Sequence, residues 1–414
     1  MTQQSMTSDT VGQDVLRVLV HTPEPTSSPA LYVDALVEAL TECGIGVTVV
    51  CPVDHDTLLH FRSNPLVRTM ESCARHIDPS LGIVGKIRSN ARFLISSCWT
   101  LVKASRSGDI VNFQYALHLP FSSIFFLCAW LRGCRVVFTA HDPLPHKWLF
   151  PAPLRWLERA ALGLNYRLSE SILVHSEAGK RAIASHYPAS AVKVSVIVHG
   201  PYKFTKAVQP RIRGEELNLL LFGALRENKG AHLAIQAVQR VHRGGGDVRL
   251  TVAGRVLNRK EQAYWDSCRT LIEEYPAPIH LLERFIPDEE LPELFSANDC
   301  FLLPYDNFHS DSGVAFMALA NGRPFLATPA GGLAQMMMDS KAGIRIEVPT
   351  VDAVEDAIRT ALAMGPERLS EMGAAGEEWV MRECGWAKVA SQMRAIFVSV
   401  RSASPTLRPS VVKA

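Results

Sequence analysis

Short apolar segments alternate with segments of helical spacing along most of this chain, and this alternation constrains the fold more than any other feature. Residues 217–222 and 248–253 are mostly apolar, and residues 231–241 between them repeat apolar side chains at helical spacing. Strands with apolar residues on both sides are typical of parallel sheets that helices cover on both faces. The pattern therefore predicts an α/β protein with doubly wound parallel sheets.

The alternation occurs in two series. The first predicts strands at 16–20, 46–51, 109–115, 135–140, 172–175 and 192–198 and helices at 31–40, 120–131, 154–168 and 178–186, with a less regular stretch between them from 52 to 108. The second predicts strands at 217–222, 248–253, 279–284, 300–304, 324–328 and 343–348 and helices at 231–241, 260–274, 288–297, 313–320 and 351–363. Two more helices are expected at 366–383 and 386–400, before a polar tail that we expect to be disordered.

An aperiodic segment up to Glu216 separates the two series and is interpreted as a linker. We therefore expect one doubly wound domain at residues 14–204, a second at 205–384, and a last helix at 385–402. Ligands of such sheets bind at the carboxyl ends of the strands. Both sheets are expected to face a shared cleft, and that cleft is where we look for chemistry.

Composition excludes several classes of protein. Hydrophobic residues are 47% of the 414 and charged residues 20%, which excludes a disordered or fibrous chain. The net charge of +2 excludes a protein that binds duplex nucleic acid through a massively basic surface, so no nucleic-acid partner is expected. The nine cysteines are odd in number and form no CxxC, a pattern that favours reduced thiols over disulfides or a zinc site.

Targeting signals are not evident in the sequence. Residues 1–13 lack the charged start and apolar centre of a signal peptide, and the longest apolar stretch, residues 124–131, is far shorter than the roughly 20 residues of a membrane-spanning helix. A cytoplasmic protein is expected.

One loop of the second series is suited to a diphosphate. After the strand at 217–222 come Gly223, then Arg226 and Lys229, and then a predicted helix. Free backbone N–H groups at a helix start and two fixed positive charges would converge there. From the spacing alone, cations that merely face solvent are an equally good interpretation.

Two further loops of the second series have a similar design. Ser310, Asp311 and Ser312 are good helix N-cap residues and precede Gly313, while Gly331 and Gly332 follow another strand. Three such loops at one sheet edge form a phosphate cradle more readily than one, although a capped buried helix would also explain the second loop. No GxGxxG follows a strand and no GxxxxGK[ST] occurs, which disfavours a dinucleotide dehydrogenase and a P-loop protein.

The order of these motifs resembles the nucleotide-sugar-binding half of GT-B glycosyltransferases of family 4. The resemblance covers nearly all of residues 217–364 and continues more loosely in the first series. Its motifs are Gly223-x-x-Arg226-x-x-Lys229-Gly230, residues 285–291, residues 298–305, Ser312-Gly313-Val314, residues 320–324 and Gly331-Gly332, and, in the first series, residues 138–142, 172–176 and 196–200.

The resemblance implies a GT-B fold: two Rossmann-like domains facing a cleft, with the last helix crossing back to the first domain. It also implies that the second domain binds a nucleoside diphosphate sugar and the first domain an acceptor. Arg226 and Lys229 would neutralise the diphosphate, which is also the leaving group, so no metal and no other cofactor is required. The other donor-binding residues that it implies are Gly223, Arg284, Phe285, Ile286, His309, Ser312, Gly313 and Val314.

The sequence departs from the family pattern at three positions. Many members carry two glutamates eight positions apart, where this chain has His309 and Met317, and a third glutamate where it has Gln335. The ribose contact is therefore unassigned.

Catalytic and acceptor-binding residues are expected in the first domain. His141 and Asp142 follow a strand, so His141 would hydrogen-bond the reacting hydroxyl or the donor sugar, and Asp142 would orient it or act as a base. The alternative is a capping Asp before Pro143 with a packed histidine. His146 is a weaker catalytic candidate. Ser28 and Pro29 match the family's acceptor-facing turn, although the serines of this segment would equally suit a helix cap.

A basic segment suggests a membrane partner. Residues 79–108 contain no acidic residue, and five cations flank apolar side chains there: Lys86, Arg88, Arg92, Lys103 and Arg106. Such a surface would dock on anionic lipid, as suits an acceptor carried on a polyprenyl diphosphate. A solvated helix face packed on its own domain is the alternative.

These observations predict a glycosyltransferase of the hexosyltransferase type, retaining by resemblance. It would move a sugar from a nucleoside diphosphate to a hydroxyl of a glycan or lipid-linked glycan, at the inner face of the membrane if it docks there. The alternatives are a catalytically silent GT-B protein that binds sugar nucleotides and a GT-B sugar-nucleotide epimerase.

Overall fold

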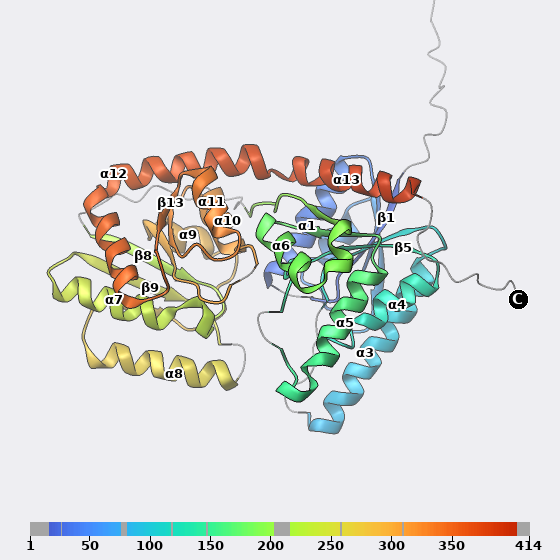
Figure 1. Cartoon of the computed structure of the whole chain (residues 1–414), viewed down its shortest axis with the longest axis horizontal. Coiled ribbons are helices and arrows are strands. Elements are labelled where there is room, and N and C mark those ends of the chain that lie inside the picture. Colours follow the sequence, from blue (N-terminus) through green and yellow to red (C-terminus); the bar gives the residue numbers. More distant parts are fainter. Residues whose placement is uncertain are drawn as a thin grey trace, which may run out of the picture. The chain divides into compact units, whose positions relative to one another are not determined.

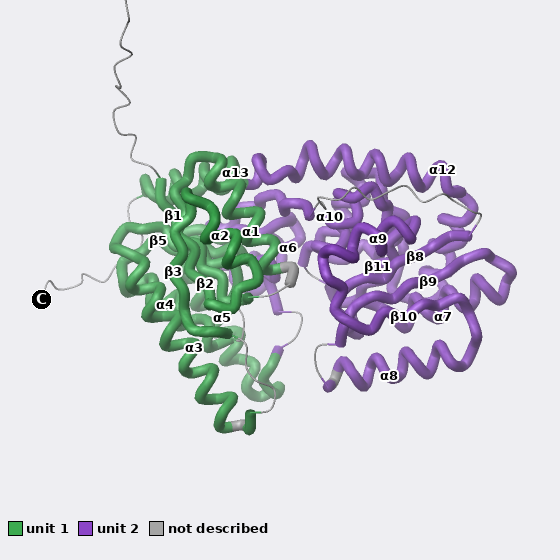
Figure 2. Tube along the Cα trace, turned by 180° about the vertical axis from the view of Figure 1, so that it is seen from behind, with its two compact units in different colours: residues 1–140, 149–172, 390–414 green, residues 141–148, 173–389 purple. Residues whose placement is uncertain are grey.

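The structure is a computed structural model that describes residues 16–25, 27–75, 81–116, 119–145, 148–202, 216–256, 259–308 and 310–403. It consists of two compact units, shown in two colours in Figure 2: residues 1–140, 149–172 and 390–414, and residues 141–148 and 173–389. His146, His309, most of the predicted linker and the polar tail lie outside the described residues. The predicted boundary near residue 205 stays a prediction.

The first sheet has seven strands in the order β3-β2-β1-β4-β5-β6-β7, as a doubly wound sheet requires. The inner strand β1 pairs in parallel with both β2 and β4. The strands are β1 Arg17–His21, β2 Gly46–Pro52, β3 Val67–Ser72, β4 Ile110–Phe113, β5 Arg135–Thr139, β6 Ser171–Val174 and β7 Val194–Val196.

The helices of the first series include two that the sequence pattern did not predict, α2 Leu58–Ser63 and α3 Ile83–Ala104. Together with β3 they fill the less regular stretch before residue 108. Helices α3, α4 and α5 lie side by side (Figure 1). The helices are α1 Ser27–Glu42, α2 Leu58–Ser63, α3 Ile83–Ala104, α4 Ser123–Leu131, α5 Arg155–Leu168 and α6 Glu177–His186, with short 3-10 turns at Ala152–Leu154 and Pro188–Lys193.

The second sheet has six strands in the order β10-β9-β8-β11-β12-β13, and the pairs along it are parallel. Leu219 and Leu221 of β8 pack into a core with α7, α8 and α12, while Leu220 packs on the opposite face with α9, α10 and α11. This explains why the strand is apolar on both sides. The strands are β8 Leu217–Phe222, β9 Val248–Ala253, β10 Ile279–Leu282, β11 Cys300–Leu303, β12 Phe325–Ala327 and β13 Gly343–Arg345.

The helices of the second series are α7 Ala231–Arg243, α8 Arg259–Glu274, α9 Leu291–Ser296, α10 Gly313–Ala320, α11 Leu333–Ser340 and α12 Val351–Cys384, with a 3-10 turn at Glu227–Lys229. Gly365, with φ +74° and ψ 170°, interrupts α12, so the two expected helices meet end to end. The last helix, α13 Trp386–Ser402, belongs to the first unit from residue 390 on. There Arg135 Nη1 donates to the carbonyl oxygen of Val400 at 2.7 Å.

The strand order places a switch point between β8 and β11, because their helical connections leave in opposite directions along the sheet. Ligands of doubly wound sheets bind at the carboxyl ends of such strands. A ligand is therefore expected at the loops that follow β8 and β11.

Candidate functional site

The loop after β8 is held tightly against its neighbours. Gly223 has φ +115°, and a Cβ on Gly254 of the next strand's loop would lie 1.7 Å from the Gly223 carbonyl oxygen. Gly230 has φ +69°, and a Cβ there would lie 2.2 Å from the carbonyl oxygen of Pro304. No side chain fits at Gly230 or Gly254 without a shift of the backbone. The loop thus has a fixed backbone path at the switch point.

The two cations of this loop differ in their surroundings. Nε of Arg226 lies 3.4 Å from Oε1 of Glu261 on α8, with 40% of the arginine side chain exposed. Nζ of Lys229 lies 3.7 Å from the centroid of the Tyr305 ring and 4.6 Å from that of Phe308. A cation over an aromatic face is positioned without losing its charge to a carboxylate. Lys229 is therefore the less neutralised of the two.

The N-terminus of α10 adjoins this loop. Ser312 caps the helix by accepting a hydrogen bond from the Ala315 N–H at 3.3 Å, and its hydroxyl donates to the Tyr305 hydroxyl at 3.4 Å. The N–H groups of Gly313 and Val314 belong to the first turn and have no acceptor within the helix. A Cβ on Gly223 would lie 3.7 Å from Cγ2 of Val314. Two donors, a helix terminus and Lys229 therefore belong to one small region.

The predicted nucleobase-facing residues follow β10 at the edge of the sheet. Arg284 pairs with Glu290 and also donates to the Phe285 carbonyl oxygen at 3.2 Å. The Phe285 ring is 50% exposed, with the Arg255 guanidinium 5.4 Å from its centroid. Ile286 is buried in the core, so it offers only its backbone. Phe285 is the exposed aromatic side chain of this segment.

The residues that replace the family's glutamates offer no carboxylate. Met317 is buried within α10, and Gln335 on α11 donates to Asp339 Oδ1 at 2.8 Å. His309 lies outside the described residues.

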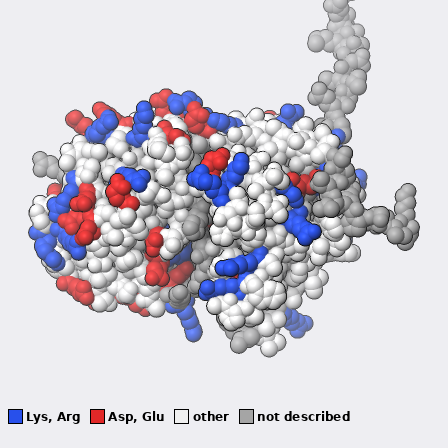
Figure 3. Space-filling model, in the orientation of Figure 1, with Lys and Arg blue, Asp and Glu red and all other residues white. Residues whose placement is uncertain are grey.

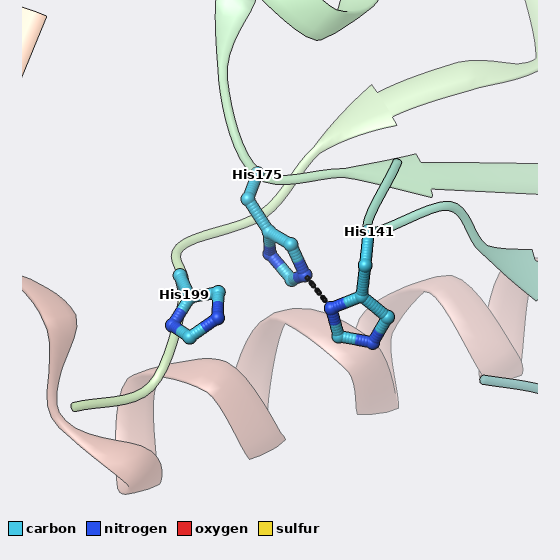
Figure 4. Close-up of side chains that lie close together, drawn as sticks. All are labelled: His141, His175 and His199. Atoms are coloured by element: carbon cyan, nitrogen blue, oxygen red, sulfur yellow. Dashed lines mark hydrogen bonds between the residues drawn. The ribbon is translucent and has the colours of Figure 1, made fainter. Parts of the chain in front are cut away.

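Three histidines follow three consecutive strands, β5, β6 and β7, and meet in the second unit (Figure 4). His175 Nε2 and His141 Nδ1 share a hydrogen bond of 3.2 Å, and His199 Nδ1 donates to the Gly200 carbonyl oxygen at 2.7 Å. The His199 ring stacks on Phe316 of α10, with centroids 4.8 Å apart. Sequence reasoning singled out His141 but neither of the other two.

The three imidazoles are neutral at physiological pH. Burial, together with the nearby His199 ring, lowers the pKa of His141 to about 3, against a smaller opposite effect of Asp142. Burial lowers the pKa of His199 to about 4, and burial and the two neighbouring rings hold that of His175 well below its ordinary value. Neutral rings can accept or donate single hydrogen bonds, or bind a metal ion.

Two carboxylates lie beside the histidines. Asp142 accepts a hydrogen bond from the Ser310 hydroxyl, which connects it to the loop before α10. The pKa of Asp311 is raised to about 6, mainly by burial. A hydrogen bond with Ser176 has a smaller, lowering effect, and the charge of Asp142 adds to the raising effect. The structure therefore brings His141 and Asp142 together with the loops of the second sheet.

The absence of a side chain at Gly332 leaves the space that the Asp311 carboxylate occupies. A Cβ on Gly332 would lie 1.7 Å from Asp311 Oδ1, and a Cβ on Gly331, at φ +58°, would lie 2.1 Å from the Ser310 carbonyl oxygen. The predicted third glycine loop thus packs on the second one.

The first unit has a separate group of buried polar side chains, which the sequence pattern did not reveal. Asn112 of β4 donates to Thr139 Oγ1 at 3.0 Å and accepts from Gln114. His21 at the end of β1 is 3.3 Å from Ser97 Oγ, and burial lowers its pKa to about 3. Ser28 and Pro29 lie in the first turn of α1, directly after this strand.

The surface carries both signs of charge, and Lys/Arg and Asp/Glu side chains are interspersed on the face shown in Figure 3. None of the described helices combines the length and the apolar character needed to cross a bilayer.

Comparison with known proteins identifies the fold. Sucrose-phosphate synthase from Thermosynechococcus elongatus superimposes with a TM-score of 0.73 at 18% identity, over 94% of this chain and 100% of that one. HepE from Anabaena, in complex with UDP and glucose, gives 0.67 at 15% identity, over 93% and 100%. Two parallel sheets with flanking helices and a returning last helix define the GT-B class of two-domain α/β proteins.

Family models match both halves of the chain. The model for Glycosyltransferase Family 4 matches residues 30–200, and that for Glycosyl transferases group 1 matches residues 203–379. The chain is a GT-B protein whose two halves resemble the two domains of family 4 glycosyltransferases. A GDP-mannose-dependent alpha-(1-6)-phosphatidylinositol monomannoside mannosyltransferase of Mycolicibacterium smegmatis is 26% identical over 180 residues, 42% of this chain and 45% of that protein. The matched stretch thus spans about half the length of this relative.

Proposed function

We propose that this protein transfers a sugar from a nucleoside diphosphate sugar to a hydroxyl of a glycan or lipid-linked glycan. The convergence of Lys229, Gly223 and the α10 N-terminus at the switch point carries this proposal. Cleaving the bond to the leaving group places growing negative charge on the diphosphate. Fixed donors and cations that meet this charge stabilise the transition state without reorganisation.

Each residue of the region has a role in this proposal. Lys229 and Arg226 bind the diphosphate, and the N–H groups of Gly313 and Val314 donate to its oxygens. These groups supply the electrostatic stabilisation that a metal ion supplies elsewhere, so the proposed transfer is metal-independent. Phe285 stacks on the nucleobase, with the backbone of Ile286 beside it.

His141 and Asp142 are proposed to act at the reacting centre. Because His141 is neutral, it can hydrogen-bond a hydroxyl but brings no positive charge. Asp142, fixed by Ser310, would orient the acceptor hydroxyl or accept its proton as the new bond forms. The proposed stereochemistry is retention, with departure and attack on the same face of the sugar, so no enzymic nucleophile is required.

A lipid-linked acceptor is proposed from the surface of α3. Val84, Ile87, Ile95 and Trp99 are between 61% and 79% exposed and lie along one stripe at helical spacing. Arg88, Arg92 and Lys103 are exposed along the same side, while Phe93 and Leu101 anchor the opposite side in the core. An apolar stripe with a basic flank suits insertion into an anionic lipid surface. The relative from Mycolicibacterium smegmatis is named for a lipid acceptor, which supports this proposal.

Thermal shift with a panel of UDP-, GDP- and ADP-sugars tests donor binding. A ligand at 100 times its Kd stabilises the folded state by about 2.7 kcal/mol. We expect one nucleotide to raise the Tm of the wild type and of Arg359→Ala but not of Arg226→Ala. Arg359 is a matched control because, like Arg226, it pairs with a glutamate and is about equally exposed, 44% against 40%. It lies on α12 beside Gly244, at the C-terminal end of α7. Normal donor binding by Arg226→Ala would overturn the assignment.

A further inference from the structure

The three histidines at the ends of β5, β6 and β7 have the arrangement of a metal-binding site. One ligand atom from each of His141, His175 and His199 lies within 4.8 Å of the other two. They come from three different strand ends, and their rings lie close together (Figure 4). No other group of three or more His, Cys, Asp or Glu side chains with this spacing occurs among the described residues.

The separations approach those of a tetrahedral zinc site. Zinc binds imidazole nitrogen at 2.0–2.1 Å, so two ligands of a tetrahedral site lie roughly 3.3 Å apart. His175 Nε2 and His141 Nδ1 are already 3.2 Å apart. The two edges toward His199 are at most 4.8 Å long and have to shorten. His141 and His175 can approach His199 by rotation about their Cα–Cβ and Cβ–Cγ bonds, while the His199 ring keeps its stacking on Phe316.

Hydrogen bonds around the cluster set the ring orientation in the way that metal-binding histidines require. His199 Nδ1 donates to the Gly200 carbonyl oxygen, so the neutral ring presents a lone pair at Nε2. Phe316 stacks on this ring and fixes its plane. The backbone of Ile197 and Val198 lies close enough to the His175 ring to raise its pKa slightly against the effect of burial.

We propose that His141, His175 and His199 together bind one late first-row divalent cation such as Zn²⁺, with a fourth position open. Imidazole ligands suit Zn²⁺, Co²⁺ and Ni²⁺. The cation replaces the proton that His141 and His175 share in their hydrogen bond. That proton moves to the other nitrogen of the imidazole that carried it, so both rings stay neutral and no redox change is involved. Three neutral imidazoles do not compete for protons at pH 7, which supports binding.

Occupation of this site would inhibit sugar transfer. His141 Nδ1 already contacts His175, so the change is that a bound cation adds positive charge beside the proposed reacting centre and holds the His141 ring in one orientation. This consequence depends on the proposed function, whereas the binding itself does not.

Cobalt titration of the full chain without an affinity tag tests the proposal. Co²⁺ in a tetrahedral site gives intense visible absorption, and we expect this signal to saturate at one equivalent and to disappear when Zn²⁺ is added. Because outer-shell changes alone cost 10–100-fold in affinity, loss of a ligand in His199→Phe or His141→Asn should weaken binding by about 100-fold or more. The phenylalanine retains an aromatic ring opposite Phe316. His242→Ala, an exposed histidine outside the cluster, should bind like the wild type.

The outcomes separate the two proposals. Wild-type protein without the visible signal, or His199→Phe with an unchanged signal, overturns the metal site. Stoichiometric binding in a protein that transfers no sugar supports the metal site and contradicts only the proposed function. Transfer that is insensitive to Zn²⁺, in a protein shown to bind it, contradicts the inhibitory role.

Discussion

Nζ of Lys229 lies 3.7 Å from the centroid of the Tyr305 ring, and the Tyr305 hydroxyl in turn accepts a hydrogen bond from Ser312 at the N-cap of α10. The cation of one loop is thereby connected to the helix terminus that follows the next strand of the sheet. Among the described residues, no carboxylate lies within ion-pair distance of Lys229. A diphosphate bound here would meet an unneutralised charge.

Lys229→Met should weaken nucleoside diphosphate binding about 10- to 100-fold, because a hydrogen bond to a charged group contributes about 1.5–3 kcal/mol. Isothermal titration with the nucleotide identified in the donor panel measures the effect. Lys103→Met is the control, since Lys103 also lies over an aromatic ring, 4.9 Å from the centroid of Trp99 in the first unit. Equal losses in the two variants would contradict a specific role for Lys229.

Gly332→Ala should destabilise the protein by about 1–3 kcal/mol, the usual cost of overpacking. The added Cβ would lie 1.7 Å from Asp311 Oδ1, while the backbone φ of −80° itself suits alanine. Gly82→Ala adds a methyl group in open space at φ −63° and should leave stability nearly unchanged. Chemical denaturation compares the two. A Gly332→Ala variant as stable as Gly82→Ala would show that the two loops do not pack as described.

The stability of the protein should respond to Asp311. The pKa of this carboxyl is raised from 3.8 to about 6 in the folded state. Between pH 3.8 and about 6 this carboxyl is protonated in the folded state and ionised in the unfolded state. Its contribution to the free energy of unfolding therefore decreases as the pH rises from about 4 to 6.

Asp311→Asn removes this titration but keeps an oxygen that can accept from Ser176. The stability of the variant relative to the wild type should rise between pH 4 and 6 and then level off. Denaturation curves at several pH values measure it, and the difference cancels the histidines that both proteins share. A difference that is flat with pH, or that falls, would contradict the raised pKa.

Trp99→Glu should abolish binding to vesicles of anionic lipid, because a charge in place of the largest side chain of the apolar stripe of α3 opposes insertion. Flotation with vesicles that contain phosphatidylglycerol measures the bound fraction. Met338→Glu introduces the same charge at a side chain that is similarly exposed, 65% against 61%, but lies on α11. Vesicle binding that survives in Trp99→Glu and fails in Met338→Glu would argue against α3 as the contact surface.

The sequence predicted the second sheet well because its strands are buried on both faces. Leu217–Phe222, Val248–Ala253 and Gly313–Ala320 begin and end where the apolar pattern placed them. The pattern did not predict α3, because this helix carries apolar residues both in the core, at Phe93, and on the surface, at Trp99. Mixed faces remove the helical period on which such a prediction depends.

The candidate site could be predicted only in part. Arg226 and Lys229 follow a clear strand, so the sequence predicts a role for them, whereas His175 and His199 lie within the motifs at 172–176 and 196–200 and have no predicted role. Their signal was nevertheless present: a histidine directly after β6 and another shortly after β7, in a sheet where parallel strands end at one edge. The sequence pattern does not give the order of these strands in the sheet. That order brings His175 and His199 next to His141.

Product analysis of the full chain with the bound nucleotide sugar and a lipid-linked glycan fraction tests the central claim most directly. We expect a glycosylated acceptor with release of the nucleoside diphosphate, in the presence of a chelator, in the wild type and Arg359→Ala but not in Lys229→Met. Donor binding without turnover against a broad range of acceptors, or an isomerised donor formed without acceptor, would contradict it.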